Sequence, residues 1–67
     1  MDETVTVAKS IYSQNYGVYF ITAVTESRHA VFFSYRERLA TGHQCRIRGT
    51  VKAHRDNSTQ LNRVKVI

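Results

Sequence analysis

Hydrophobic and polar residues alternate along most of this chain with the two-residue period of β-strands. The alternating runs are rich in Val, Ile, Thr, Phe and Tyr, which favour extended structure. Turn-type residues separate them, and Ser13 to Tyr16 followed by Gly17 predicts a hairpin turn between the first two runs. We therefore expect five strands, at residues 4–12, 18–25, 29–35, 43–53 and 59–67.

The alternation is irregular in two places and contains one mid-strand glycine. Its phase slips near Lys9, and it shifts again between Leu61 and Val64, where a β-bulge around Asn62 and Arg63 would explain the change. Gly49 inside the fourth run predicts a sharp bend or bulge. Residues 36–41 are too few for an independent helix, which needs about 12 residues, so we expect at most one helical turn there.

Five strands without a substantial helix predict an all-β fold in one domain, residues 1–67. An open sheet of this size would leave an apolar face and two edges exposed, so we expect it to curl into a small, closed five-stranded barrel. An SH3-like barrel and a bare antiparallel sheet that pairs into a dimer are the alternatives.

The charge of the chain indicates what kind of partner it binds. Ten Lys and Arg against five Asp and Glu give a net charge of +5 and an isoelectric point near 9.9. Most of the basic residues lie from Arg36 onward, and they alternate with apolar residues, which is typical of a folded surface. A polyanion is the natural partner for such a surface.

Aromatic residues gather in the second and third predicted strands and just before them. Assigning Phe20 and Phe32 to the core places Tyr19, Phe33 and Tyr35 on the outer surface, where unpaired bases could stack on them. A phase shift of one residue would exchange the two sets.

The fourth predicted strand has one mainly apolar face and one basic face. Cys45, Ile47, Gly49, Val51 and Ala53 alternate with polar residues, so the basic side chains should project from the opposite side. We expect a phosphate-binding stripe there, continued by the next turn and the last strand. Its candidate members are Arg46, Arg48, Lys52, Arg55, Arg63 and Lys65. His54, at the end of the fourth strand, is a further candidate that could stack on a base or contact phosphate.

No catalytic or metal-binding pattern is visible in the sequence. The five acidic residues are scattered, no Ser/His/Asp arrangement occurs, and Cys and His lack zinc-site spacing. We expect no enzyme activity, no cofactor and no metal, with Cys45 as a small core residue. The absence of an apolar run of about 20 residues and of a basic signal peptide predicts a cytoplasmic protein that does not enter membranes.

Several short motifs resemble the OB-fold family, in the form found in single-strand-binding modules of phage and plasmid replication and recombination proteins. They are YGVYF at 16–20, VFF at 31–33, Gly42, GTVKAH at 49–54 and TQLNRV at 59–64, and the resemblance extends over nearly the whole chain. Two departures stand out. The family's helix between strands three and four is reduced to one turn at most, and the turn at 56–58 is shorter than the family's glycine-containing loop.

The resemblance implies a module that binds single-stranded DNA, with RNA as the alternative, in replication, recombination or repair. Stacking by Tyr19, Phe33 and Tyr35 would give little sequence preference. A single OB unit covers about 4–16 nucleotides, so we expect a homo-oligomer or a place in a larger replication or repair complex. If the source is a phage, the compartment is the host cytoplasm. The other hypothesis is a small protein-interaction module or inhibitor that uses the same face.

Overall fold

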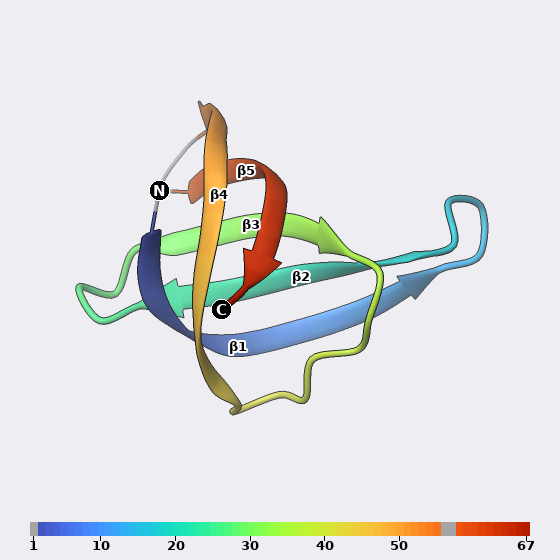
Figure 1. Cartoon of the computed structure of the whole chain (residues 1–67), viewed down its shortest axis with the longest axis horizontal. Helices are drawn as coiled ribbons and strands as arrows, with labels where there is room; N and C mark the ends of the chain where they lie inside the picture. Colours follow the sequence, from blue (N-terminus) through green and yellow to red (C-terminus); the bar gives the residue numbers. More distant parts are fainter. Residues whose placement is uncertain (1, 56–57) are drawn as a thin grey trace.

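The computed structural model describes residues 2–55 and 58–67, without the side chain of Arg55, and its chain forms five strands (Figure 1). The described residues contain no helix, and all five predicted strands are confirmed. The turn expected at 56–58 lies largely outside the described residues. The strands are β1 (Asp2–Ser13), β2 (Val18–Thr25), β3 (Ala30–Tyr35), β4 (Gln44–Arg55) and β5 (Ser58–Val66).

The sheet closes on itself in the order β1-β2-β3-β5-β4, with β4 paired back to β1. Neighbouring strands are antiparallel, except that β3 and β5 are parallel over Ala30 to Phe32 and Ser58 to Gln60. This is a small OB-type barrel, so the prediction of a closed barrel is confirmed and the open sheet is excluded. The hairpin between β1 and β2 projects well beyond it (Figure 1).

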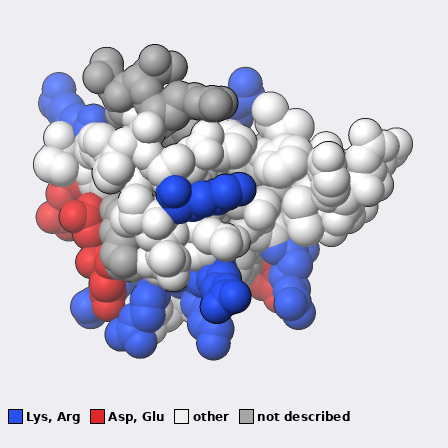
Figure 2. Space-filling view, turned by 90° about the horizontal axis from the view of Figure 1, so that it is seen from above, with Lys and Arg blue, Asp and Glu red and all other residues white. Residues whose placement is uncertain are grey.

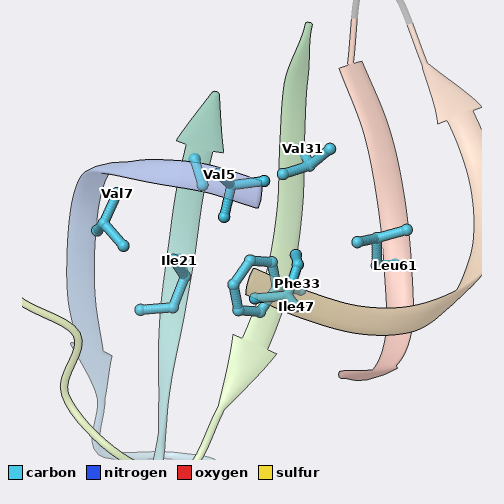
Figure 3. Packing of buried hydrophobic residues seen from close by; sticks show 8 residues of the cluster. Val5, Val7, Ile21, Val31, Phe33, Ile47 and Leu61 are labelled. Carbon is cyan, nitrogen blue, oxygen red and sulfur yellow. The ribbon is translucent and has the colours of Figure 1, made fainter. Parts of the chain in front are cut away.

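The core consists of small, β-branched and leucine side chains around one phenylalanine (Figure 3). The connection between β3 and β4 adds Leu39, which packs against this core. A single apolar side chain of that connection thus covers core residues without any helix. The buried hydrophobic residues are Val5, Val7, Ile21, Ala23, Val31, Phe33, Ile47 and Leu61.

Three β-bulges interrupt the ladders. The β1–β2 register skips Ala8, which confirms the phase slip near Lys9. In the β4–β5 ladder, Arg63 and Val64 together face Gly49, and Lys52 is the extra residue between Val51 and Ala53. A Cβ on Gly49 would lie 2.8 Å from Cγ2 of Val64, so the close approach at the bulge requires glycine. The bend at Gly49 and the bulge near Arg63 are therefore confirmed.

The predicted phase of the second and third strands is wrong by one residue. Phe33 is 1% exposed and Phe32 is 38% exposed, the reverse of the expectation. Tyr19 and Tyr35, also expected on the outer surface, pack against the core. Both faces of β2 carry apolar side chains, so alternation alone does not decide which face is buried.

The predicted inner face of the fourth strand is correct only in its first half. Ile47 is fully buried and Cys45 is half-buried, whereas Val51 is 43% exposed and Ala53 is exposed. Val51 and Ala53 lie beyond Arg48, the last residue of β4 that pairs with β1. The bulge at Lys52 also turns Ala53, because an extra residue in one strand changes the direction of the side chains that follow it.

Candidate functional site

Two outward phenylalanine rings form the centre of an aromatic patch, which we define as Tyr16, Phe20 and Phe32. Phe20 on β2 lies opposite Ser34, and Phe32 on β3 lies opposite Thr22, so the two rings are diagonal neighbours. Their centroids are 6.1 Å apart and their planes differ by 20°. Tyr16 in the β1–β2 turn is 75% exposed and meets Phe20 edge-on at 6.2 Å. The patch therefore combines flat rings from two strands and a turn, of which Tyr16 and Phe32 are exposed and Phe20 is half-buried.

A shallow pocket beside the patch brings polar groups to the rings. Its lining includes Lys52, which the β4 bulge places next to β5, together with the side chains of Gln60 and Asn62. The pocket thus combines ring faces with an ammonium group and two amides, which donate and accept hydrogen bonds. Its full lining is Phe20, Phe32, Phe33, Ser34, Lys52, Gln60, Leu61 and Asn62.

The predicted basic stripe is divided between separate parts of the barrel. Of its members, Lys52 lines the aromatic pocket. Arg46 and Arg48 lie where β4 pairs with β1, opposite Thr4 and Asp2. Arg63 lies further along β5, in a second groove. The expectation of one continuous stripe on β4 is therefore not met.

Arg46 and Arg48 share one acidic partner. Nε of Arg46 is 2.7 Å and an Nη of Arg48 is 3.3 Å from the carboxylate of Asp2. The hydrogen bond from Arg46 holds the pKa of Asp2 below its usual value, and the same contact raises the pKa of Arg46. Both arginine side chains are largely exposed to solvent, so this ion pair orients the two guanidinium groups more than it stabilises the fold.

The second groove, which we call the basic groove, is lined by Tyr35, Arg36, Arg63, Val64 and Lys65. Lys65 also lies directly opposite Arg48 in the β4–β5 ladder. Like charges directly opposite each other on adjacent strands repel, so this part of the surface favours an anionic partner.

Figure 2 shows how charge is distributed on one face of the molecule. Lys and Arg side chains surround a largely uncharged area, and one basic side chain lies across it. Asp and Glu gather at one end, and the lobe projecting at the other end carries no charge. Uncharged and basic surfaces are thus adjacent on this face, as binding of a strand with bases and phosphates requires.

His54 is tied to the end of the barrel where β5 begins. Its Nδ1 is 3.2 Å from the hydroxyl of Thr59, which also hydrogen-bonds Nε2 of His29. Thr59 is buried, so the two imidazoles satisfy a polar group that water does not reach. This contact gives His54 a structural role. The side chain of Arg55 is outside the described part of the structure.

Sequence reasoning missed Phe20, Phe32, Tyr16, Gln60 and Asn62 as site residues. One signal could have found Phe32: Ser34 shares its face, whereas Val31 and Tyr35 share the face of Phe33. The face that carries Phe32 and Ser34 is the more polar one, and the more polar face of a strand is expected on the outer surface. Nothing in the sequence locates Lys52 beside these rings, because its position depends on a bulge.

Other chemistry-bearing groups are dispersed. Burial raises the pKa of the Cys45 thiol. Within residues 2–55 and 58–67, no three His, Cys, Asp or Glu side chains gather as metal ligands would. The described part of the chain forms no helix with the length and apolar character to cross a membrane.

Comparison with known proteins returned no family model, no curated protein and no solved structure that matches this chain.

Proposed function

We propose that this barrel binds single-stranded nucleic acid by stacking unpaired bases on the aromatic patch. The observation that carries the proposal is the nearly parallel, outward pair Phe20 and Phe32, which lines one pocket together with Lys52. Each base stacked on an aromatic ring contributes about 1–3 kcal/mol, and every base has a face to stack. Binding with little sequence preference follows from that mechanism.

The position of the patch supports the proposal. In OB barrels the face formed by strands 2 and 3 is the usual surface for oligonucleotides. Phe20 is on β2 and Phe32 is on β3. Folding does not require the exposed ring of Phe32, because Phe33 already fills the core beneath it. Binding of a ligand would explain why a large apolar side chain is exposed there.

The polar lining supplies the remaining contacts. Amide groups of Gln60 and Asn62 can hydrogen-bond the edges of any base, since each amide both donates and accepts. Lys52 can neutralise a phosphate between stacked bases. The net charge of +5 would draw the strand to the protein before these contacts form.

We favour DNA over RNA because of the sequence resemblance to replication modules, and we place the activity in replication, recombination or repair. The proposal assigns binding and no catalysis to the chain. It includes assembly into a homo-oligomer or a larger complex, because the patch offers stacking for only a few bases. It also includes a cytoplasmic location, which for a phage protein is the host cytoplasm.

A fluorescence-anisotropy titration with labelled oligothymidine at several salt concentrations tests the proposal. We expect binding at low salt that weakens as salt rises, with a log–log slope of about −0.7 for each phosphate contacted. Competition with matched RNA and DNA oligomers decides between the two strands. Absence of binding at low salt would contradict the proposal.

A second candidate, a protein-interaction module, is favoured by the β1–β2 hairpin. Residues 10–25 carry no charge, and Ile11 and Tyr12 are 49% and 52% exposed. The β1–β4 ladder ends at Thr6, so the outer edge of β1 beyond the bulge is available for another strand. Under this hypothesis the protein would not bind oligothymidine at low salt. Replacing Ile11 and Tyr12 by serine would then abolish a self-association measured by sedimentation.

A further inference from the structure

The basic groove gathers three cationic side chains from two segments that are distant in the sequence. Arg36 follows β3, whereas Arg63 and Lys65 lie on β5, and the ring of Tyr35 lines the same groove. All three basic residues are exposed. Exposed like charges held close together repel unless an anion lies between them.

These three cations differ from the other cluster of arginines. Arg46 and Arg48 are both paired with Asp2. Among the described residues, no carboxylate forms an ion pair with Arg36, Arg63 or Lys65, although Glu37 is the next residue in the chain. The groove therefore keeps its full positive charge for a ligand.

The backbone of Arg63 is adapted to this arrangement. Its φ is +54°, in the left-handed region, which costs a residue with a side chain about 1–2 kcal/mol. The bulge opposite Gly49 imposes this conformation and leaves two consecutive side chains, Asn62 and Arg63, exposed. Asn62 lines the aromatic pocket and Arg63 lines the basic groove, so the bulge directs one side chain to each.

The two binding regions follow one another along the seam between β3 and β5. The paired part of that seam ends at Phe32 and Gln60. Beyond it, the aromatic pocket includes Ser34 and Asn62, and the basic groove begins with the next residues, Tyr35 and Arg63. A ligand long enough to leave the pocket along this seam would enter the groove.

We infer that the basic groove binds the phosphodiester backbone of the strand whose bases stack on the aromatic patch. This inference rests on the proposed function and adds the path of the bound strand, which runs from Phe32 along the seam towards Lys65. Two guanidinium groups can each hold phosphate oxygens in a bidentate manner, and Lys65 adds a point charge. Arg46 lies opposite Thr4 on β1, off this path, whereas Arg48 borders the end of the path because it lies opposite Lys65 in the β4–β5 ladder.

Two double variants with equal net charge test the inference. Arg36→Gln with Arg63→Asn removes two charges from the groove, and asparagine tolerates the left-handed backbone. Arg28→Asn with Arg46→Gln also removes two charges, from residues that line neither the aromatic pocket nor the basic groove, and is the matched control, since Arg28 shares the left-handed backbone of Arg63. Thermal melts establish that both are folded. Affinity is then measured against salt for labelled oligothymidines of about four and about twelve nucleotides, within the site sizes of single OB barrels.

With the longer oligomer, we expect the groove variant to reduce the log–log salt slope by about 1.4, which is two phosphates at about 0.7 each. The control variant should change the slope by less than half as much. With the shorter oligomer, which the patch alone can hold, both variants should resemble the parent protein.

Equal slope changes in the two variants, or an unchanged slope in the groove variant, would overturn the inference. Loss of affinity in Phe32→Ala in the same titrations would at the same time support the proposed function. If the parent protein binds neither oligomer, the proposed function itself fails. The two failures are thus distinguishable.

Discussion

The ring of Phe32 stacks on that of Phe20 across two strands, at a centroid distance of 6.1 Å and an angle of 20°. Phe33, its neighbour in the chain, points to the other side of the sheet and is almost completely buried. Two adjacent phenylalanines therefore have opposite roles. One supports the barrel from inside, and the other presents a ring to solvent.

The first prediction compares how much Phe33 and Phe32 contribute to the free energy of unfolding. Phe33→Ala removes the largest fully buried side chain and should lower the free energy of unfolding by about 3–5 kcal/mol. Phe32→Ala, at an exposed position, should lower it by less than about 1 kcal/mol. Urea denaturation followed by circular dichroism measures both. Similar losses in the two variants would show that the strand phase is not as described.

The second prediction concerns the close approach at Gly49. Gly49→Ala puts a methyl group 2.8 Å from Cγ2 of Val64 and 3.3 Å from the carbonyl oxygen of Asn62, so the strands must separate. We expect a loss of about 1–3 kcal/mol in the free energy of unfolding, as for other overpacked sites.

The double variant Gly49→Ala with Val64→Ala is the control for this steric explanation. Val64→Ala alone creates space and should cost stability by itself, but it should make the added methyl group less harmful. A double-mutant cycle measures the coupling. Strictly additive effects would mean that Gly49 is needed for some reason other than contact with Val64.

The third prediction concerns the buried hydroxyl of Thr59. Thr59→Val keeps the shape of the side chain but removes the hydrogen bonds to His29 and His54. Loss of a buried hydrogen-bonding group costs about 1–3 kcal/mol when its partners stay unsatisfied, and exposed imidazoles should bring the loss to the lower end. Thr50→Val, at an exposed site of β4, is the matched control and should change stability by about 0.5 kcal/mol or less.

The fourth prediction uses the pKa of Asp2. Because the folded-state pKa is lowered, any stability from the contacts with Arg46 and Arg48 is present above the unfolded-state pKa and is lost as pH falls through the folded value. The difference in melting temperature between the parent and Asp2→Asn should be constant above about pH 5 and should shrink below about pH 4. A difference that persists unchanged at pH 2 would contradict the proposed ion pair.

The sequence was sufficient to predict the five strands and the closed barrel, because strand propensity, turn residues and the mid-strand glycine all agree. Gly49 and the phase shift near Arg63 also indicated where the β4–β5 ladder would bend. The side of the sheet on which each aromatic ring lies could not be read from β2, where both faces are apolar. An error of one residue there moves every side chain to the other face.

A different reason prevented prediction of which residues come together in the candidate site. Lys52 reaches Phe20 and Phe32 through a bulge, and Arg63 joins Arg36 because β5 runs parallel to β3 at the seam. Both relationships depend on register and closure of the barrel. Alternation along a single strand instead suggested that Arg46, Arg48 and Lys52 act together, whereas Asp2 holds the first two elsewhere.

Stacking of bases on Phe20 and Phe32 is the central feature of the proposed binding mode. The most direct measurement is the affinity of labelled oligothymidine for Phe32→Ala and for Tyr12→Ala. Tyr12 is an exposed ring that meets Tyr19, outside the patch. We predict an affinity about 5- to 150-fold lower for Phe32→Ala, equivalent to about 1–3 kcal/mol, and an affinity near that of the parent for Tyr12→Ala. Equal affinities of Phe32→Ala and the parent, with both proteins folded, would contradict the central claim.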